Sequence, residues 1–380
     1  MALNIAESSL RIKDFEFNLR ELAGSMGDFG TLFPLAIGYF AVNGMNPTGL
    51  LVMLGIANIV TGIIYKLPIP LQPMKVLAVV AIAQKWPPSL IYASGVVTGA
   101  IWLILSLTGL VQKLAAITPR SVVRGIQVAL GIMLAIEGFK MVSTWWILGA
   151  ISIVIVIILR TNKYAPAAIV LMLLGIGIMG FKGQLSGVVQ PSFSAPPITL
   201  FNPIEMWQGL VLAGFAQLPL TATNAVIATS ALLKEYFPSR PVSEKKLALN
   251  MGIMNITLPF FGGMSMCHGA GGLAGQYYFG ARTGGTNIME GIIEISLGLF
   301  LAGSIGTLFA IFPKSIIGAM MFLAGLQLTK FARDIKKREI VIITVTVAVS
   351  LLANMAIGFV VAVITYHALR RWKLVAKYIG

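Results

Sequence analysis

The chain has 380 residues, of which 57% are hydrophobic and 11% are charged, and its mean hydropathy is +0.89. Soluble domains carry about 25% charged residues and keep a large solvated surface, so this composition excludes a soluble enzyme, a disordered chain and a collagen-like fibre. The formal net charge of +15 fits basic loops beside a membrane and requires no nucleic acid.

Twelve apolar segments reach, or nearly reach, the roughly 20 residues that a membrane-spanning helix needs. They lie near residues 22–42, 47–65, 89–111, 122–141, 144–160, 164–181, 204–229, 247–262, 286–310, 315–331, 339–353 and 355–370. Two more segments, 73–84 and 269–280, are too short to cross and follow Pro-rich and Gly-rich stretches. The sequence therefore predicts an all-α polytopic membrane protein of about fourteen transmembrane segments, two of them interrupted.

The distribution of Lys and Arg predicts the orientation of these segments. If residues 1–21 are a cytoplasmic N-terminal segment and the chain crosses fourteen times, twenty-three of the 28 basic residues lie on the cytoplasmic side. Lys85, Lys140, Lys182 and Lys314 then lie outside, and Lys75 lies within the membrane. Cytoplasmic loops are enriched in Lys and Arg, so we expect a multi-pass protein of the cell membrane with both termini in the cytoplasm.

The longest uncharged connection, 183–203, separates two halves of seven segments each. It contains four prolines and is predicted to be an extracellular linker between a first repeat, 22–182, and a second repeat, 204–380. Because seven is odd, the second half must be inverted relative to the first. The weakly similar strings FPLA (33–36) and LPLT (218–221) occupy matching segments of the two halves. Inverted repeats are typical of secondary transporters.

The two short segments indicate a substrate site, because interrupted helices at matching places of two repeats mark such sites. In LPIPLQPMKVLAVVAI (67–82), the prolines prevent a regular helix before about Pro73 or Met74. In CHGAGGLAGQYYFGAR (267–282), the glycines allow close approach of a ligand to the backbone, although they can also serve helix packing. Two facing helix N-termini with free N–H groups predict an anion site that needs no metal.

The candidate substrate-binding residues flank these breaks or share one polar helix face. They are Gln72, Met74, Lys75, Gln217, Thr221, Asn224, His268, Gly269, Ala270, Gly271 and Gly272. Lys75 carries the strongest argument, since a charge at mid-membrane costs about 3 kcal/mol and a positive one invites an anion. The alternative for Lys75 is a permanent salt bridge to Asp28, Glu137, Glu290 or Glu294. The residues 217, 221 and 224 are spaced i, i+4, i+7, and their alternative role is hydrogen bonding between helices.

A second group, Asp28, Glu290, Glu294 and Arg282, is expected to couple transport to protons or to form structural ion pairs. Glu290 and Glu294 are four residues apart and share a helix face. The single cysteine, Cys267, excludes an intramolecular disulfide, and two histidines cannot supply zinc spacing. We expect no catalytic residue, no metal and no cofactor, and therefore no enzyme.

Four stretches resemble the molybdate transporter family within the sulfate permease (SulP) superfamily. They are LRELAGSMGDFGTLFPL (19–35), PLQPMKVLAVVAIAQ (70–84), QLPLTATNAV (217–226) and CHGAGGLAGQYYFGARTGG (267–285). The resemblance implies two inverted seven-segment repeats whose third and tenth segments are half-helices preceded by short strands. It also implies a core domain that moves against a gate domain, and homodimers formed through the gate. The chain stops at Gly380 without the STAS domain that many sulfate permeases carry.

By this resemblance the chain is expected to be a secondary active transporter, a symporter that moves molybdate by alternating access in a lipid membrane. Tungstate and sulfate are tetrahedral dianions as well, so a sulfate or other oxyanion transporter is the first alternative. A nucleobase permease is a weaker alternative, because the face formed by residues 217–224 lacks a carboxylate to hold a neutral base. An anion channel remains open too, since half-helices also build pores.

Overall fold

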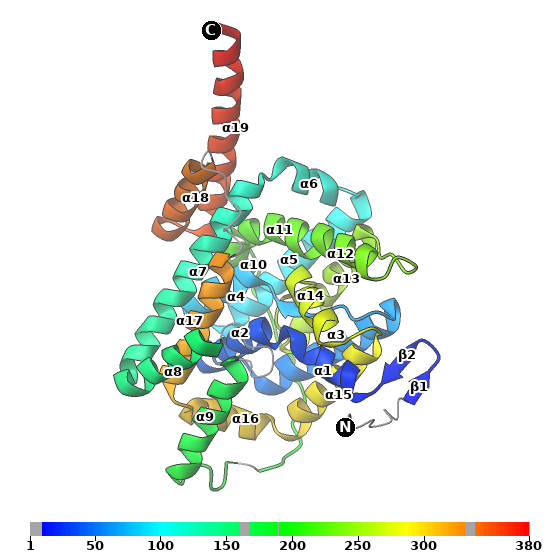
Figure 1. Ribbon diagram of the computed structural model, residues 1–380, viewed down its shortest axis with the longest axis vertical. Helices are drawn as coiled ribbons and strands as arrows, with labels where there is room; N and C mark the ends of the chain where they lie inside the picture. The colour runs from blue at the N-terminus through cyan, green and yellow to red at the C-terminus, as the bar shows by residue number, and fades with distance from the viewer. Residues whose placement is uncertain (1–9, 160–166, 189, 331–338, 380) are drawn as a thin grey trace, which may run out of the picture.

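The computed structural model describes residues 10–159, 167–188, 190–330 and 339–379. Across these residues the chain is a helical assembly (Figure 1). It has two small antiparallel sheets, and the residues of one of them are buried. Residues 1–9 of the predicted N-terminal segment lie outside the described residues. The same holds for several basic residues predicted to be cytoplasmic, namely Arg160, Lys163, Arg333, Lys336, Lys337 and Arg338.

The first half begins with a β-hairpin and continues as helices interrupted once by a short strand. The hairpin consists of β1 (Leu10–Ile12) and β2 (Phe15–Phe17). In chain order there follow α1 (Leu19–Ser25), η1 (Met26–Asp28), α2 (Phe29–Ala41), α3 (Pro47–Tyr65), β3 (Gln72–Pro73), α4 (Lys75–Ala83), α5 (Pro88–Thr108), α6 (Val111–Ile117), α7 (Arg120–Val142), η2 (Ser143–Trp145), α8 (Trp146–Leu159) and α9 (Ala167–Phe181).

The second half also contains one short strand, and its first helical stretch includes two π-helical turns, η3 and η4. In chain order it comprises α10 (Pro203–Gly209), η3 (Leu210–Gly214), α11 (Phe215–Thr221), η4 (Ala222–Ile227), α12 (Ala228–Tyr236), α13 (Glu244–Thr257), η5 (Leu258–Phe261), β4 (Met266–Cys267), α14 (Ala270–Phe279), α15 (Gly285–Phe300), α16 (Ala302–Ile311), α17 (Lys314–Lys330), α18 (Ile340–Leu352) and α19 (Met355–Ile379).

Fewer helices are of spanning length than the hydropathy pattern predicts. Within the described residues four helical stretches are long and apolar enough, namely 47–65, 88–108, 120–159 and 203–236, or five if α15 and α16 form one broken span. The segment predicted at 286–310 bends by 82° between these two helices, and the one predicted at 22–42 is divided by η1. Hydropathy reports which residues avoid water, whereas the continuity of a helix depends on its packing partners.

Glycines set the closest helix contacts. In the antiparallel pair α7 and α17, Gly138 lies against Gly318, where a Cβ at Gly138 would be 2.6 Å from the Gly318 carbonyl oxygen. In the pair α3 and α15, a Cβ at Gly62 would be 2.6 Å from the Gly284 carbonyl oxygen. Small residues allow such close approach between helices in lipid, where packing rather than water exclusion holds helices together.

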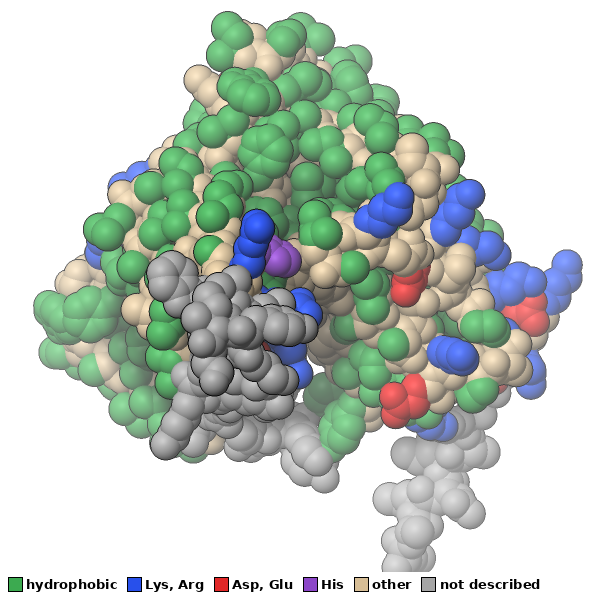
Figure 2. All heavy atoms as spheres, turned by 90° about the horizontal axis from the view of Figure 1, so that it is seen from above, with side chains coloured by type: hydrophobic (Ala, Val, Ile, Leu, Met, Phe, Trp, Pro, Cys, Tyr) green, Lys and Arg blue, Asp and Glu red, His purple; other side chains and the backbone are tan. Residues whose placement is uncertain are grey.

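The outer surface is suited to lipid. Large apolar side chains are widely exposed, among them Leu352 at 87% and Ile158 at 69%. Seen from the end at which α6 and α19 lie, hydrophobic side chains cover much of the molecule, and Lys and Arg side chains gather towards one edge (Figure 2). Exposed apolar area on this scale marks a surface that contacts a membrane.

Candidate functional site

The two interrupted segments meet at the interior sheet. Gln72 pairs with Cys267 and Pro73 with Met266, in antiparallel register. The N–H of Met74 extends this ladder by donating to the carbonyl oxygen of Ser265 at 2.9 Å. As predicted, the helices that follow are short: α4 has nine residues and α14 has ten, and each starts within three residues of its strand. The N-termini of both half-helices therefore originate at one place in the protein interior.

Two buried asparagines hold these breaks extended. The Asn255 side chain donates to the carbonyl oxygen of Met266 and accepts from its N–H, both at 2.7 Å. The Asn287 side chain does the same for Ile69, at 2.8 Å and 3.1 Å. Each amide substitutes for a neighbouring strand and satisfies backbone groups that would otherwise be buried without partners. We did not single out either residue from the sequence, although an Asn inside an apolar helix is a usable signal.

The N-terminus of α4 is already capped by a side chain from α11. Gln217 Oε1 accepts from the N–H groups of Val76 at 2.7 Å and Leu77 at 3.3 Å, and Gln217 Nε2 donates to Thr221 Oγ1 at 2.6 Å. We expected Gln217 and Thr221 to donate directly to an oxyanion. Instead they satisfy the backbone donors of α4, which removes those donors from direct contact with a ligand.

The N-terminus of α14 is different. The N–H groups of Ala270, Gly271 and Gly272 have no acceptor among the described residues, and the N-cap residue Gly269 has no side chain to offer one. Gly271 is exposed, whereas Gly272 is buried. Free donors at the positive end of a helix dipole are the elements of an anion site. Among the described residues, α14 thus has three backbone donors without an acceptor, whereas α4 has one, the N–H of Lys75.

A chain of three buried side chains lies against this end of α14. Gln72 Nε2 donates to Oδ1 of Asp28, and Lys75 Nζ donates to Oε1 of Gln72 at 2.8 Å. A Cβ at Gly272 would lie 2.9 Å from Asp28 Oδ1, so glycine is needed for this approach. In the described part of the chain, Lys75 forms no direct salt bridge with any of the four acids considered above, and Glu137 pairs with Lys140 at 2.5 Å.

Among the described residues, His268 and Asn224 have no side-chain hydrogen bond to Asp28, Gln72 or Lys75. His268 is fully buried, with Nδ1 3.3 Å from the carbonyl oxygen of Pro70 and Nε2 3.2 Å from the side-chain nitrogen of Asn250. A carbonyl oxygen can only accept, so Nδ1 carries the proton and donates it to Pro70. An amide nitrogen can only donate, so Nε2 accepts from Asn250, and neither ring nitrogen has a proton left for a ligand. Asn224 is half-buried within the π-helical turn η4, which interrupts the regular i, i+4, i+7 face.

The remaining predicted acids line a cavity of about 370 Å³ with mainly apolar walls, which also include Met26 and Phe29 from the segment that contains Asp28. Glu294 Oε2 accepts from Asn58 Nδ2 at 2.8 Å, whereas Glu290 Oε2 is buried without a hydrogen-bond partner among the described residues. Arg282 lies at the other end of α14, where its guanidinium donates to the carbonyl oxygen of Tyr277 at 2.6 Å and stacks 3.7 Å above the Tyr277 ring. Among the described residues, neither acid forms an ion pair with Arg282, which is one of the structural alternatives for them.

Glu21 is a buried acid that we did not single out from the sequence. Its carboxylate accepts from the N–H groups of Arg282 at 3.0 Å and Thr283 at 3.1 Å, and from the hydroxyl of Thr286. These bonds tie α1 to the turn between α14 and α15. Glu21 therefore holds the C-terminal end of the half-helix whose N-terminus has the free donors.

Comparison with known sequences covers both breaks. The family model described as "Molybdate transporter of MFS superfamily" matches residues 20–134 and 209–328. Molybdate transporter 1 of Arabidopsis thaliana is 32% identical over 93% of this chain and 89% of its own length, and Molybdate transporter 2 of the same plant is 30% identical over 92% and 87%. Molybdate transporter 1 of Chlamydomonas reinhardtii is 25% identical over 93% and 92%.

Solved structures share the fold at low sequence identity. The transmembrane domain of the cyanobacterial bicarbonate transporter BicA superposes with a TM-score of 0.68 and 15% identity, covering 93% of this chain and 98% of that one. Murine Slc26a9, an anion transporter in the inward-facing state, superposes with a TM-score of 0.69 and 14% identity, covering 96% and 70%. The all-α polytopic fold thus resembles the transmembrane domain of SulP/SLC26 transporters.

Proposed function

The chain belongs to the molybdate transporter family, and from this premise we propose that it moves molybdate across the cell membrane by alternating access. As a member of a transporter family it is not an enzyme. The proposed site lies where α4 and α14 begin, with the anion held by the free N–H groups of residues 270–272 and by the charge of Lys75. Tungstate and sulfate, also tetrahedral dianions, are the expected competitors.

The observation that carries this proposal is the contrast between the two half-helices. Gln217 occupies two donors of α4, those of Val76 and Leu77, whereas the donors of Ala270, Gly271 and Gly272 have no acceptor among the described residues. A tetrahedral oxyanion offers acceptors in several directions and carries the charge that a helix N-terminus favours. Gln72, whose amide oxygen binds Lys75, lies directly against Gly269, so the ammonium group is close to the same end of α14.

The other candidate residues have supporting roles in this proposal. Met74 continues the ladder between the breaks, Gln217 and Thr221 cap α4, and His268 braces the carbonyl of Pro70. Such groups fix the positions of the donors before the anion arrives. Donors that are already held in position lose less conformational entropy when the anion binds.

We also propose proton-coupled symport through Asp28. Moving a dianion towards a negative interior is unfavourable by about 2.3 kcal/mol per charge at 100 mV, so uptake needs a driving ion. Gln72 connects Asp28 to Lys75, which makes protonation of Asp28 a direct way to increase the positive charge near the anion. Glu290 and Glu294 are the second candidates, because they face an apolar cavity rather than this chain. Uptake that does not respond to a proton gradient would refute the coupling.

The helix pairings support two inverted seven-segment repeats, 22–182 and 204–380. The second segment, α3, packs on the eleventh, α15, and the fourth, α5, packs on the ninth, α13. If each segment is replaced by its counterpart in the other half, the α3–α15 pair becomes the α13–α5 pair. The β3–β4 ladder and the α7–α17 pair each consist of two counterparts, so they stay the same. On this basis we propose a core domain, a moving gate domain, a homodimer and cytoplasmic termini.

Molybdate binding to the purified protein tests the site. Lys75→Ala should weaken binding roughly 10- to 100-fold, the usual range for a lost hydrogen bond to a charged group. Gly271→Leu should prevent binding by filling the space before the free donors. Lys113→Ala, at an exposed cation, is the matched control. Tungstate should compete with molybdate strongly and sulfate weakly. If both site variants bind as the unmodified protein does, the site assignment is wrong.

A further inference from the structure

A second cavity, of about 350 Å³, lies between the end of α3 and the start of α13, apart from the proposed anion site. Its walls include Ile64 and Tyr65 of α3, Lys246 and Ile253 of α13, and Arg240 from the loop before α13. Two cations and several apolar side chains therefore line one space, and no Asp or Glu is among its lining residues.

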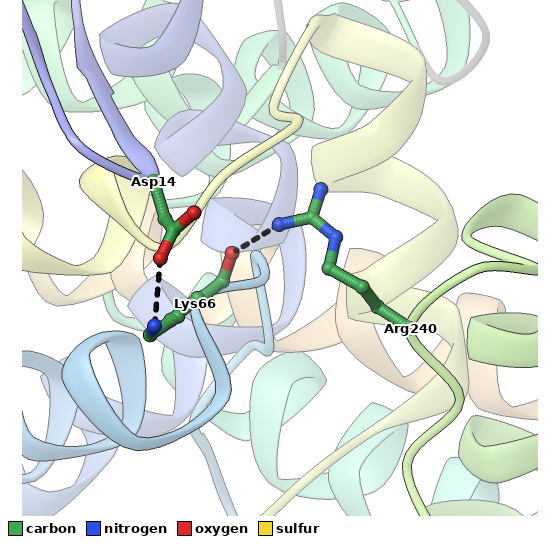
Figure 3. A network of polar contacts seen from close by, with 3 residues as sticks. All are labelled: Asp14, Lys66 and Arg240. Carbon is green, nitrogen blue, oxygen red and sulfur yellow. Dashed lines mark hydrogen bonds and ion pairs between the residues drawn. The ribbon is translucent and has the colours of Figure 1, made fainter.

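Two acids lie near these cations, and each has another hydrogen-bond partner. Asp14 pairs with Lys66 at 2.6 Å, and this hydrogen bond, the Lys66 charge and, more weakly, the Arg240 charge lower the pKa of Asp14 from its ordinary value (Figure 3). Glu244 accepts from Gln112 Nε2 at 2.7 Å. Arg240 donates to the neutral carbonyl oxygen of Lys66 at 3.3 Å (Figure 3), so its guanidinium keeps its positive charge for another partner.

The apolar part of the cavity indicates which anion it suits. Ile64 is 59% exposed and Ile253 is 49% exposed, and both are cavity-lining residues. A free inorganic anion gains nothing from such walls, whereas an amphiphile places its chain there and its charge on the cations. Basic pockets between transmembrane helices suit anionic lipid headgroups, and anionic lipids are concentrated in the cytoplasmic leaflet.

We propose that this cavity binds one anionic phospholipid, with the phosphate between Arg240 and Lys246 and an acyl chain along Ile64 and Ile253. A hydrogen bond joins the two helices that form the walls of this site. Tyr65 donates from its hydroxyl to the carbonyl oxygen of Lys246 at 2.9 Å. Bound lipid therefore stiffens the contact between α3 and α13.

A second connection runs through Asn250, which lines the cavity. Its side-chain nitrogen lies 3.2 Å from Thr61 Oγ1 and 3.2 Å from His268 Nε2. The other ring nitrogen of His268 contacts the carbonyl oxygen of Pro70, just before β3. The lipid is thus a few contacts away from the interior ladder, and its binding should raise the thermal stability of the protein.

The test uses the full chain in phosphatidylcholine nanodiscs titrated with phosphatidylglycerol. Native mass spectrometry measures the lipid retained, and thermal unfolding measures the stabilisation. We expect retention of phosphatidylglycerol over phosphatidylcholine. Arg240→Gln with Lys246→Gln should weaken it roughly 30-fold, as expected for two basic side chains near an anionic headgroup. The matched control, Lys113→Gln with Lys234→Gln, removes two exposed cations outside the cavity and should leave retention unchanged.

Three further measurements decide between explanations. Arg240→Lys with Lys246→Arg keeps both charges and should retain the lipid, which separates charge from misfolding. Glycerol 3-phosphate has the headgroup chemistry without acyl chains, and an equal stabilisation by it would overturn the lipid proposal in favour of a free phosphate. Equal retention of phosphatidylcholine, or equal loss in the control variant, would overturn it as well.

Discussion

Gln72 connects two buried charges of opposite sign, since its amide nitrogen donates to Oδ1 of Asp28 and its amide oxygen accepts from Lys75 Nζ at 2.8 Å. A primary amide can serve both charges because it has a donor and an acceptor at fixed positions. Asp28 and Lys75 therefore influence each other without forming a direct ion pair.

Replacing Gln72 with Leu should lower molybdate affinity about tenfold or more. The change keeps the size of the side chain but leaves the Lys75 ammonium and the Asp28 carboxylate without their shared partner, and buried charged groups are costly to leave unpaired. Isothermal titration of the purified protein measures the effect. Gln112→Leu, at an exposed glutamine, is the control. Unchanged binding in Gln72→Leu would mean that the three-residue chain does not support the site.

Replacing Asp28 with Asn should abolish the pH response of uptake. If Asp28 takes up the coupling proton, acidifying the outside of proteoliposomes should accelerate molybdate entry in the unmodified protein and leave Asp28→Asn unaffected. Glu290→Gln is the comparison, because Glu290 is not part of the hydrogen-bonded chain Asp28–Gln72–Lys75 and should keep the response. Loss of the response in Glu290→Gln alone would transfer the coupling role to that residue.

Replacing Gln217 with Leu should destabilise the protein by about 1–3 kcal/mol, the cost of buried donors that lose their acceptor. The donors concerned are the N–H groups of Val76 and Leu77 in the first turn of α4. Thermal unfolding in detergent measures the loss, again with Gln112→Leu for comparison. A melting temperature equal to that of the unmodified protein would show that water or another group can replace the Gln217 amide.

Gly138→Ala should destabilise the α7–α17 contact, whereas Gly177→Ala should be neutral or slightly stabilising. A Cβ at Gly138 would lie 2.6 Å from the carbonyl oxygen of Gly318, whereas one at Gly177 would have nothing within 4 Å. Both positions are helical, and alanine favours a helix over glycine by about 1 kcal/mol. The two substitutions should therefore shift the melting temperature in opposite directions. Equal shifts would show that the helices separate without cost.

Several features of this protein could be predicted because single residues restrict the backbone or carry a charge whatever their neighbours are. Pro68, Pro70 and Pro73 exclude a regular helix in the first break. The glycines after His268 indicate a close approach to the backbone at the second break, and three of them lie inside α14. The low charge content identified lipid as the solvent. Lys75 was notable for its charge in an apolar stretch, and the structure does bury it near the interior ladder.

The availability of each donor was decided by partners that are distant along the chain. Gln217 is 141 residues from Val76, and Asn287 is 218 residues from Ile69, yet these side chains decide which backbone groups are satisfied. Sequence patterns state which residues are polar, apolar or helix-breaking, because those properties belong to single residues. Only the tertiary structure pairs each donor with an acceptor, so only it could distinguish the capped end of α4 from the open end of α14.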